Sequence, residues 1–300
     1  MLQNNNASRF LNKYKGLLGI LPAFLFVLFF FGGGIIQSLL ISFGNEPEYY
    51  GNSEFAAAYR ELLDFSFFQS IGVTVGIALA ISLLAGVIGF IVSLILAAST
   101  AKHTWIQMLL QLPFGVPHLL AGYMLMQTFM QTGWYSRVAY HFGLIDSFEQ
   151  FPELVHDRYG IGVVLAYMWK EIPFIVLLTY PFLLKLIRQW QETSKILGAS
   201  FLQLIRWVII PLVMPLWVGG MWVVFAFAIG AYEIPALLAR TSLRFVPVMA
   251  WQEYTQFGIE RQPIAIAMNM VLAIIALVVG LLLIYLQKNW YVKGRKIWSD

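Results

Sequence analysis

The sequence contains no cysteine, which excludes disulfide bonds, thiolate nucleophiles and cysteine-ligated metal sites. Charged residues are also scarce. Asp, Glu, Lys and Arg together make up 11% of the 300 residues, whereas hydrophobic side chains make up 60%. A soluble globular domain of this length needs far more polar surface than this composition supplies. The sequence therefore indicates a protein that lies largely within a membrane.

Signatures of nucleotide chemistry and catalysis are missing as well. No glycine-rich loop ending in Lys-Ser or Lys-Thr occurs, so a process driven by ATP would require a separate subunit. The four histidines, His103, His118, His141 and His156, lie at no metal-ligand spacing. His118 follows Pro117 in an apolar segment, and we interpret it as a polar residue satisfied within a helix bundle. We therefore expect no catalytic residue, no metal site and no nucleic-acid partner.

Six apolar segments are each long enough to cross a hydrocarbon layer about 30 Å thick. They cover approximately residues 16–43, 66–98, 105–130, 161–186, 207–234 and 264–287. A basic leader, 1–15, precedes them, and a basic tail, 288–300, follows. The first apolar run is too long for the core of a signal peptide, so we expect an uncleaved span. The predicted fold class is an all-α integral membrane protein with six transmembrane helices.

The basic residues are distributed unevenly between the two sides that six spans would create. Twelve lie in the termini and the even-numbered connections, six lie in the odd-numbered connections, and Lys170 lies within a span, which accounts for all nineteen. The six are arginines: Arg60, Arg137, Arg158, Arg240, Arg244 and Arg261. The bias of basic residues toward the inner side therefore places both termini and the connection after the fourth span in the cytoplasm.

Two spans contain features that are costly in lipid. Pro113 and Pro117 lie one turn apart in the third span and predict a bend or a break. Lys170 and Glu171 lie about ten residues into the fourth span, where a charge costs at least about 2.5–3.5 kcal/mol unless it is paired or hydrated. Adjacent residues of a helix point about 100° apart, so these two side chains need separate partners or a water-filled cavity.

Tyr232 and Glu233 lie near the outer end of the fifth span. Glu233 is a candidate partner for Lys170 or a separate residue of a translocation pathway. Two interpretations of the buried charges stay open: an ion pair that holds helices together, or the lining of a pathway through the membrane.

The connection Gln191–Arg206, QETSKILGASFLQLIR, mixes charged residues with apolar ones. Gly198 can end a short helix where a left-handed conformation is needed. Apolar side chains such as Ile196, Leu197 and Phe201, placed outside the bilayer, predict burial against a partner. The alternative is an amphipathic connector that lies on the membrane surface.

This stretch resembles the EAA loop of ABC importer permeases. Glu192 occupies the position of the Glu, Thr193 and Ser194 replace the two Ala, Gly198 follows at the expected spacing, and Pro211 occupies the position of the final Pro. WKEIPF at 169–174 looks like an element in the fourth span of many importer permeases. GAYEIPALLA at 230–239, with FVPVMAWQEY at 245–254, is similar to the permeases for polyamines, ferric iron, thiamine or phosphonates.

The resemblance implies a type I ABC importer permease in the bacterial plasma membrane. Residues 16–287 would form the six-helix permease domain, with an EAA coupling loop at 191–215. The residues that it implies for ATPase coupling are Glu192, Thr193, Ser194, Ile196, Leu197, Gly198, Ala199 and Pro211. The candidates for the translocation pathway are Lys170, Glu171, Tyr232 and Glu233.

The resemblance also implies several partners. They are the lipid bilayer, two ABC ATPase subunits that carry the ATP and Mg, a second permease subunit (a copy of this chain or a paralogue) and an extracytoplasmic solute-binding protein. This chain would hold no cofactor and would not itself be an enzyme.

For the solute, the resemblance leads us to expect a polyamine first, with ferric iron, thiamine or a phosphonate as alternatives. Two other classes of function were weighed. In a secondary carrier or channel, Lys170, Glu171 and Glu233 would form an ion relay, and ATP dependence would distinguish it from an importer. A membrane-embedded enzyme is disfavoured because the sequence shows no paired catalytic groups.

Overall fold

The computed structural model describes residues 19–44, 55–99 and 104–297. The expectations for the leader 1–15 and for residues 298–300 lie outside this part of the chain. Within it, the regular secondary structure is helical and includes no strand. This confirms the all-α prediction. A helix satisfies the backbone N–H and C=O groups within its own segment, which lipid cannot do.

The chain divides into two compact units, Met1–Leu62 with Glu253–Ala267, and Leu63–Gln252 with Met268–Asp300. In the first unit an apolar helical segment covers Gly19–Ser42 and includes a π-helical turn, η1 (Leu28–Gly32), and α2 (Gly33–Ser42). None of its most apolar window is buried within the chain. Its surface is therefore available to lipid or to another subunit.

Polar and aromatic contacts hold the rest of the first unit together around α4 (Ala57–Glu61). The hydroxyl groups of Ser42 and Tyr59 are 2.9 Å apart and share a hydrogen bond. Arg261, at the end of η5 (Ile259–Arg261), forms ion pairs with Glu61 at 2.6 Å and Glu253 at 2.8 Å.

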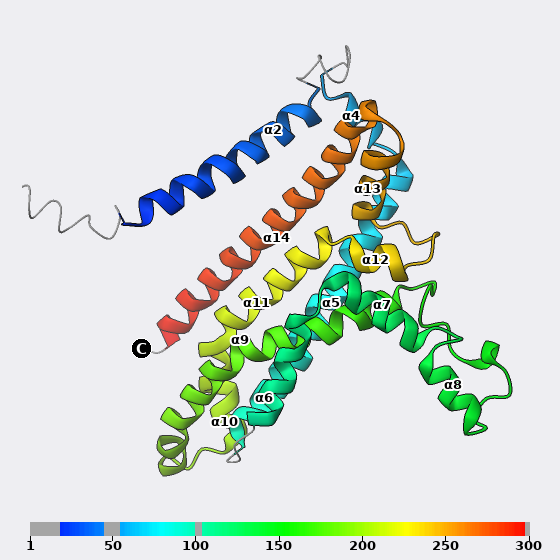
Figure 1. Cartoon of the computed structure of the whole chain (residues 1–300). Coiled ribbons are helices and arrows are strands. Elements are labelled where there is room, and N and C mark those ends of the chain that lie inside the picture. Colours follow the sequence, from blue (N-terminus) through cyan, green and yellow to red (C-terminus); the bar gives the residue numbers. More distant parts are fainter. Residues whose placement is uncertain (1–18, 45–54, 100–103, 298–300) are drawn as a thin grey trace, which may run out of the picture. The chain divides into compact units, whose positions relative to one another are not determined.

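The second unit is built around three long helices, α5 (Phe65–Ala98), α9 (Ile161–Ile196) and α11 (Ile210–Gly230), which pack on one another (Figure 1). The backbone of α5 approaches α9 closely at Gly89, where a Cβ atom would lie 2.7 Å from the Cβ of Ile175. Small residues permit this close packing between apolar helices, where lipid offers little competing hydrophobic force.

Asp64 explains where α5 begins. Its carboxylate accepts a hydrogen bond from the backbone N–H of Ser66 at 3.3 Å, which satisfies one of the free donors at the start of the helix. A hydrogen bond from the Ser66 hydroxyl lowers the pKa of this carboxyl group. The boundaries of α5 confirm the predicted second span within one residue.

The third predicted span is broken where its prolines predicted a break. α6 (Thr104–Gln111) leads into the 3-10 turn η2 (Leu112–Gly115), and α7 (His118–Phe129) then leaves at an angle of 106°. Five helices of the described chain are long and apolar enough to cross a membrane, and this bent pair makes six if it crosses as one span.

Two helices extend beyond the spans predicted for them. The fourth helix, α9, continues ten residues past the predicted end at 186, so Gln191–Ile196 form its last turns rather than a loop. After a short connection, α10 (Phe201–Leu204), the π-helical turn η4 (Ile205–Ile209) and α11 form one helical segment. The sixth helix, α14 (Gln262–Ile297), likewise extends into the predicted basic tail.

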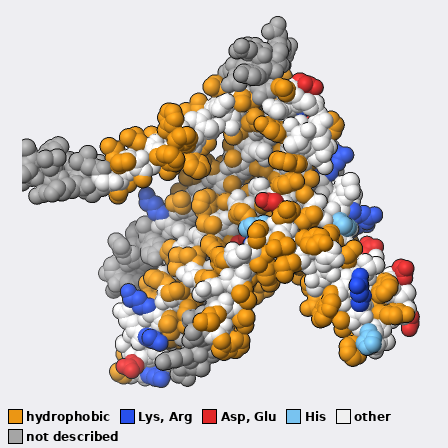
Figure 2. Space-filling model, in the orientation of Figure 1, with side chains coloured by type: hydrophobic (Ala, Val, Ile, Leu, Met, Phe, Trp, Pro, Cys, Tyr) orange, Lys and Arg blue, Asp and Glu red, His pale blue; other side chains and the backbone are white. Residues whose placement is uncertain are grey.

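The connections predicted to be polar loops contain short helices. These are α8 (Trp134–His141), η3 (Phe148–Gln150), α12 (Glu233–Leu238) and α13 (Val246–Gln256). Figure 2 shows that hydrophobic side chains occupy much of the visible surface, as expected where lipid replaces water. Basic side chains gather where α9 and α10 meet, and the exposed ones there are Lys185, Arg188, Lys195 and Arg206.

Candidate functional site

The first candidate site is the Gly198 turn, which we define as residues Glu192–Ala199 at the end of α9. Gly198 has φ +71°, a left-handed conformation that glycine adopts without strain. The N–H of Gly198 donates to the carbonyl of Lys195 at 3.1 Å, and the N–H of Ala199 donates to that of Ser194 at 2.9 Å. These bonds satisfy carbonyls that the end of the helix leaves free.

The start of the next helix, α10, is fixed by two reciprocal hydrogen bonds. The hydroxyl of Ser200 accepts from the N–H of Gln203 at 3.3 Å, and the side chain of Gln203 accepts from the N–H of Ser200 at 2.7 Å. This reciprocal cap specifies where α10 begins. Two ordered helix ends therefore enclose the short connection at Gly198.

The apolar side chains of this region separate into two groups. Ile196 is 85% exposed, Leu197 78% and Leu202 75%. Leu204, by contrast, is buried in a cluster with residues of α5, α9 and α11. The exposed group has no partner within the described chain that covers it, so this end of the second unit presents apolar surface beside exposed basic side chains.

The structure brings most of the predicted coupling residues together. Glu192 and Thr193 are exposed on the last turns of α9, and Ser194 donates its hydroxyl to the carbonyl of Gln191 at 2.8 Å. Pro211 lies elsewhere, near the start of α11. The π-helical turn η4 directly precedes it, as expected for a proline that cannot donate to the preceding turn.

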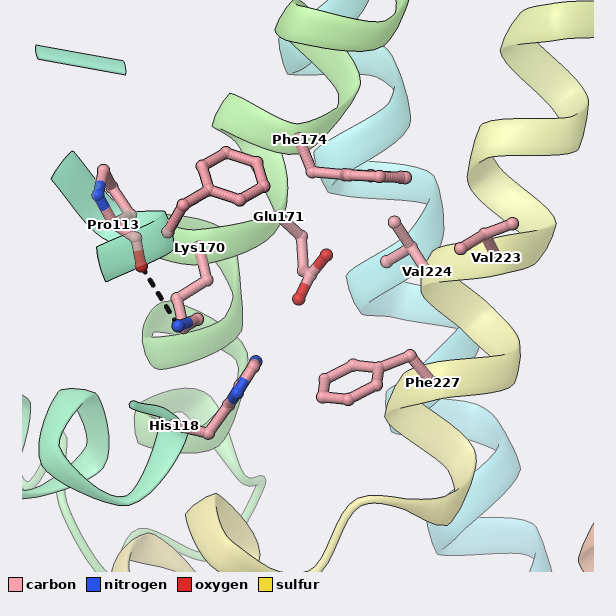
Figure 3. A pocket seen from close by; sticks show the side chains of 9 residues that line it. Pro113, His118, Lys170, Glu171, Phe174, Val223, Val224 and Phe227 are labelled. Carbon is pink, nitrogen blue, oxygen red and sulfur yellow. Dashed lines mark hydrogen bonds between the residues drawn. The ribbon is translucent and has the colours of Figure 1, made fainter. Parts of the chain in front are cut away.

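The second candidate site is a cavity of about 260 Å³ bounded by η2, α7, α9 and α11 (Figure 3). Lys170 and Glu171 of α9 both line it, and each is only 8% exposed. The other lining residues are Pro113, Phe114, His118, Phe174, Val223, Val224 and Phe227. Two charged side chains thus lie within an otherwise apolar and aromatic chamber.

Lys170 is bound to backbone carbonyls rather than to a carboxylate. Its ammonium donates to the carbonyl of Pro113 at 3.1 Å and to that of Val116. The residue after Val116 is Pro117, which has no N–H group. It therefore cannot donate a hydrogen bond to the Pro113 carbonyl four residues before it. The Pro113 carbonyl accepts instead from the N–H of Val116 at 3.4 Å, so Lys170 adds a second donor there and also donates to the Val116 carbonyl at the break between η2 and α7. Within the described chain it forms no ion pair with Glu171 or Glu233.

Tyr232 and Glu233 do not line this cavity. Both are half-buried where α12 begins, and the ring of Tyr232 packs on Trp251 with centroids 5.1 Å apart. The four predicted pathway residues thus fall into two separate pairs.

Of the nine residues that line the cavity, sequence reasoning assigned only Lys170 and Glu171 to the pathway, and His118, Phe174 and Phe227 are among those that it missed. His118 is half-buried at the start of α7, and its ring packs on Phe227 with centroids 4.7 Å apart. Phe174 follows Glu171 by three residues and so shares its face of α9, a spacing that the sequence already shows. Phe227 joins them only through the packing of α11.

Comparisons with known proteins identify a matching family and related sequences. The family model of the binding-protein-dependent transport system inner membrane component matches residues 87–293, which include both candidate sites. The sulfate transport system permease protein CysT of Synechocystis sp. is 30% identical over 199 residues, or 65% of this chain and 63% of that protein. The inner membrane ABC transporter permease protein YnjC of Escherichia coli is 25% identical over 189 residues, or 62% of this chain and 35% of that protein.

The fold is similar to that of solved transporters. A chain of a bacterial ABC transporter involved in the import of the acidic polysaccharide alginate aligns with a TM-score of 0.75 and 16% identity, covering 95% of this chain and 99% of that one. At this identity the likeness concerns the fold alone. The matches to the first two curated relatives span 63% and 46% of their lengths.

Proposed function

Because this chain belongs to the family of binding-protein-dependent transport inner membrane components and is a type I ABC importer permease, we propose that it forms half of a solute pathway driven by ATP. The Gly198 turn would bind the ATPase subunit and transmit its movement. One observation carries the coupling role: Ile196 and Leu197 are among the most exposed apolar side chains, on a turn whose backbone is fixed by hydrogen bonds.

A rigid apolar projection is suited to transmitting displacement. The side chains of Ile196 and Leu197 supply apolar surface that a partner can bury. The capped helix ends hold the backbone beneath them in one conformation. From the Gly198 turn, α9 runs without a break to the cavity at Lys170 and Glu171. At about 1.5 Å per residue, the helix spans roughly 40 Å between the two sites. Movement of the turn would therefore reach the cavity through a single element.

The proposed assembly contains this chain, a second permease (a copy or a paralogue), two ATPase subunits with their ATP and Mg, and an extracytoplasmic solute-binding protein. The proposed location is the bacterial plasma membrane, with six crossings and both termini inside. The exposed basic side chains near the Gly198 turn support this orientation. Family membership favours import driven by ATP over the ion-relay carrier weighed above.

The solute is a separate question. The names of the curated relatives refer to sulfate, and the structural neighbour imports alginate, so these comparisons give the expectation of a polyamine no support. The same holds for ferric iron, thiamine and phosphonate. Sulfate is therefore one candidate for the solute of this chain.

The coupling role is tested by paired substitutions of exposed apolar residues. We expect Ile196→Asp with Leu197→Asp to reduce recovery of the ATPase subunit with the purified permease by about tenfold or more, because the charges cannot be buried in the contact. The control is Leu144→Asp, which changes a leucine that is 77% exposed in the connection after α8. Equal recovery of the ATPase from both variants would contradict the coupling role.

A further inference from the structure

Glu171 is the least satisfied charged group of the cavity. Its side chain is 8% exposed, and its carboxylate points into the cavity between α9 and α11 (Figure 3). Among the described residues, none donates a hydrogen bond to it and none forms an ion pair with it. A buried carboxylate without a partner is costly. Its position in an open chamber therefore indicates a partner that comes from outside the chain.

Lys170 is not that partner, although it is the next residue along the helix. Its ammonium is turned toward η2 and donates to the carbonyls of Pro113 and Val116 (Figure 3). The charged group that the chamber leaves without a hydrogen-bond partner is consequently Glu171. An anion entering this chamber would meet a carboxylate, and two of the three N–H groups of the lysine are already engaged.

The walls around Glu171 are aromatic. Phe174 lies one turn further along α9, and Phe227 reaches the chamber from α11, with the His118 ring packed on it. Tyr167 lies one turn before Glu171, and its ring centroid is 6.3 Å from that of Phe227. The Tyr167 hydroxyl is buried without a hydrogen bond in the described chain, which adds a second unused polar group beside the same ring.

A carboxylate framed by aromatic faces matches the chemistry of an organic ammonium ion. The carboxylate supplies a charge-assisted hydrogen bond, and the faces of the rings attract a cation through their quadrupoles. Val223 and Val224 complete an apolar wall that suits a methylene chain. Sulfate has no donor for Glu171 and no apolar part for these walls.

We propose that this cavity binds a small alkylammonium group, with Glu171 as its counter-ion and Phe174 and Phe227 as flanking rings. The inference rests on the proposed function, because it assigns the chemical class of a solute that the permease would pass. It assigns a class different from that in the names of the sulfate permeases.

The test is calorimetric titration of the purified full chain in lipid nanodiscs with butylammonium, 1-butanol and sulfate. We expect saturable binding of butylammonium and no binding of 1-butanol or sulfate. Glu171→Gln should weaken the binding of butylammonium by about tenfold or more, because it removes the charge and keeps the shape. Phe227→Leu should weaken it by about threefold or more, because it removes the ring and keeps an apolar side chain.

The matched control is Glu149→Gln, which removes an exposed carboxylate on η3 outside the cavity and should leave the affinity unchanged. Unchanged binding in the folded Glu171→Gln variant, preferential binding of sulfate, or no binding of butylammonium would each overturn the inference. If Glu171→Gln does not fold, unchanged binding in Phe227→Leu overturns it. Recovery of the ATPase subunit is measured on the same protein. If the chain retains the ATPase but binds no amine, this inference is overturned and the proposed function stands.

Discussion

At the scale of single residues, Lys170 and Glu171 are neighbours with different surroundings. Lys170 satisfies the carbonyls at the break before α7, whereas Glu171 points into the cavity. The sequence predicted that the two side chains need separate partners or a hydrated cavity, because adjacent helix positions diverge. It could not predict that carbonyls of η2 would bind the lysine, since that contact joins residues 57 positions apart in the chain.

Replacing Lys170 tests its role at the break. Lys170→Met keeps an apolar stem but removes the donor to the partly buried Val116 carbonyl and one of the two donors to the Pro113 carbonyl, at about 1–3 kcal/mol for a carbonyl left without a partner. We expect the midpoint of thermal unfolding in detergent to fall by several degrees, at about 2–4 °C per kcal/mol for a chain of this size. An unchanged midpoint would show that the lysine does not stabilise the break.

A second substitution makes this test specific. Pro117→Ala removes the proline that stops the helix from continuing through the break, and a continuous helix brings the N–H of residue 117 to the Pro113 carbonyl four residues earlier. The double variant Lys170→Met, Pro117→Ala should therefore recover part of the lost stability, a coupling that a double-mutant cycle measures. Strictly additive losses would mean that Lys170 acts through some other contact.

At the scale of elements, α9 links the two candidate sites, and its end shows why this helix is longer than the predicted fourth span. Hydropathy placed the end of the fourth span near residue 186, because charged residues begin there. A helix can continue past the edge of the lipid bilayer. Gln191, Glu192 and Lys195 are all good helix formers. α9 ends only where Gly198 reverses the backbone, a position that the sequence did predict as a helix end.

Substitutions at Gly198 test whether this glycine determines where α9 ends. A Cβ atom at this position would meet nothing within 4 Å, so a substitution acts through the positive φ alone. Gly198→Val should cost about 1–2 kcal/mol in the turn and reduce solute uptake driven by ATP, whereas Gly198→Asn, which tolerates this conformation, should retain most of it. Uptake in cells, normalised to the amount of permease in the membrane, is the measurement. Equal uptake by the two variants would contradict a role for the turn geometry.

At the scale of the whole molecule, composition was sufficient to predict a helical membrane protein, and the two prolines of the third span predicted its break. The cavity was not predictable, because it forms where α7, α9 and α11 pack, and packing partners are not encoded by periodicity alone. The segment Gly19–Ser42 and the Gly198 turn both leave apolar surface exposed.

As an importer permease, this chain is proposed to present the Gly198 turn to an ATPase in the cytoplasm. Because the sequence has no cysteine, Leu197→Cys and Leu144→Cys each place a single thiol at a leucine of equal exposure, 78% and 77%. In intact cells an impermeant thiol reagent should label the thiol at position 144 and not that at 197. Both should react once the membrane is permeabilised. Labelling at position 197 in intact cells would place the turn outside and contradict the account.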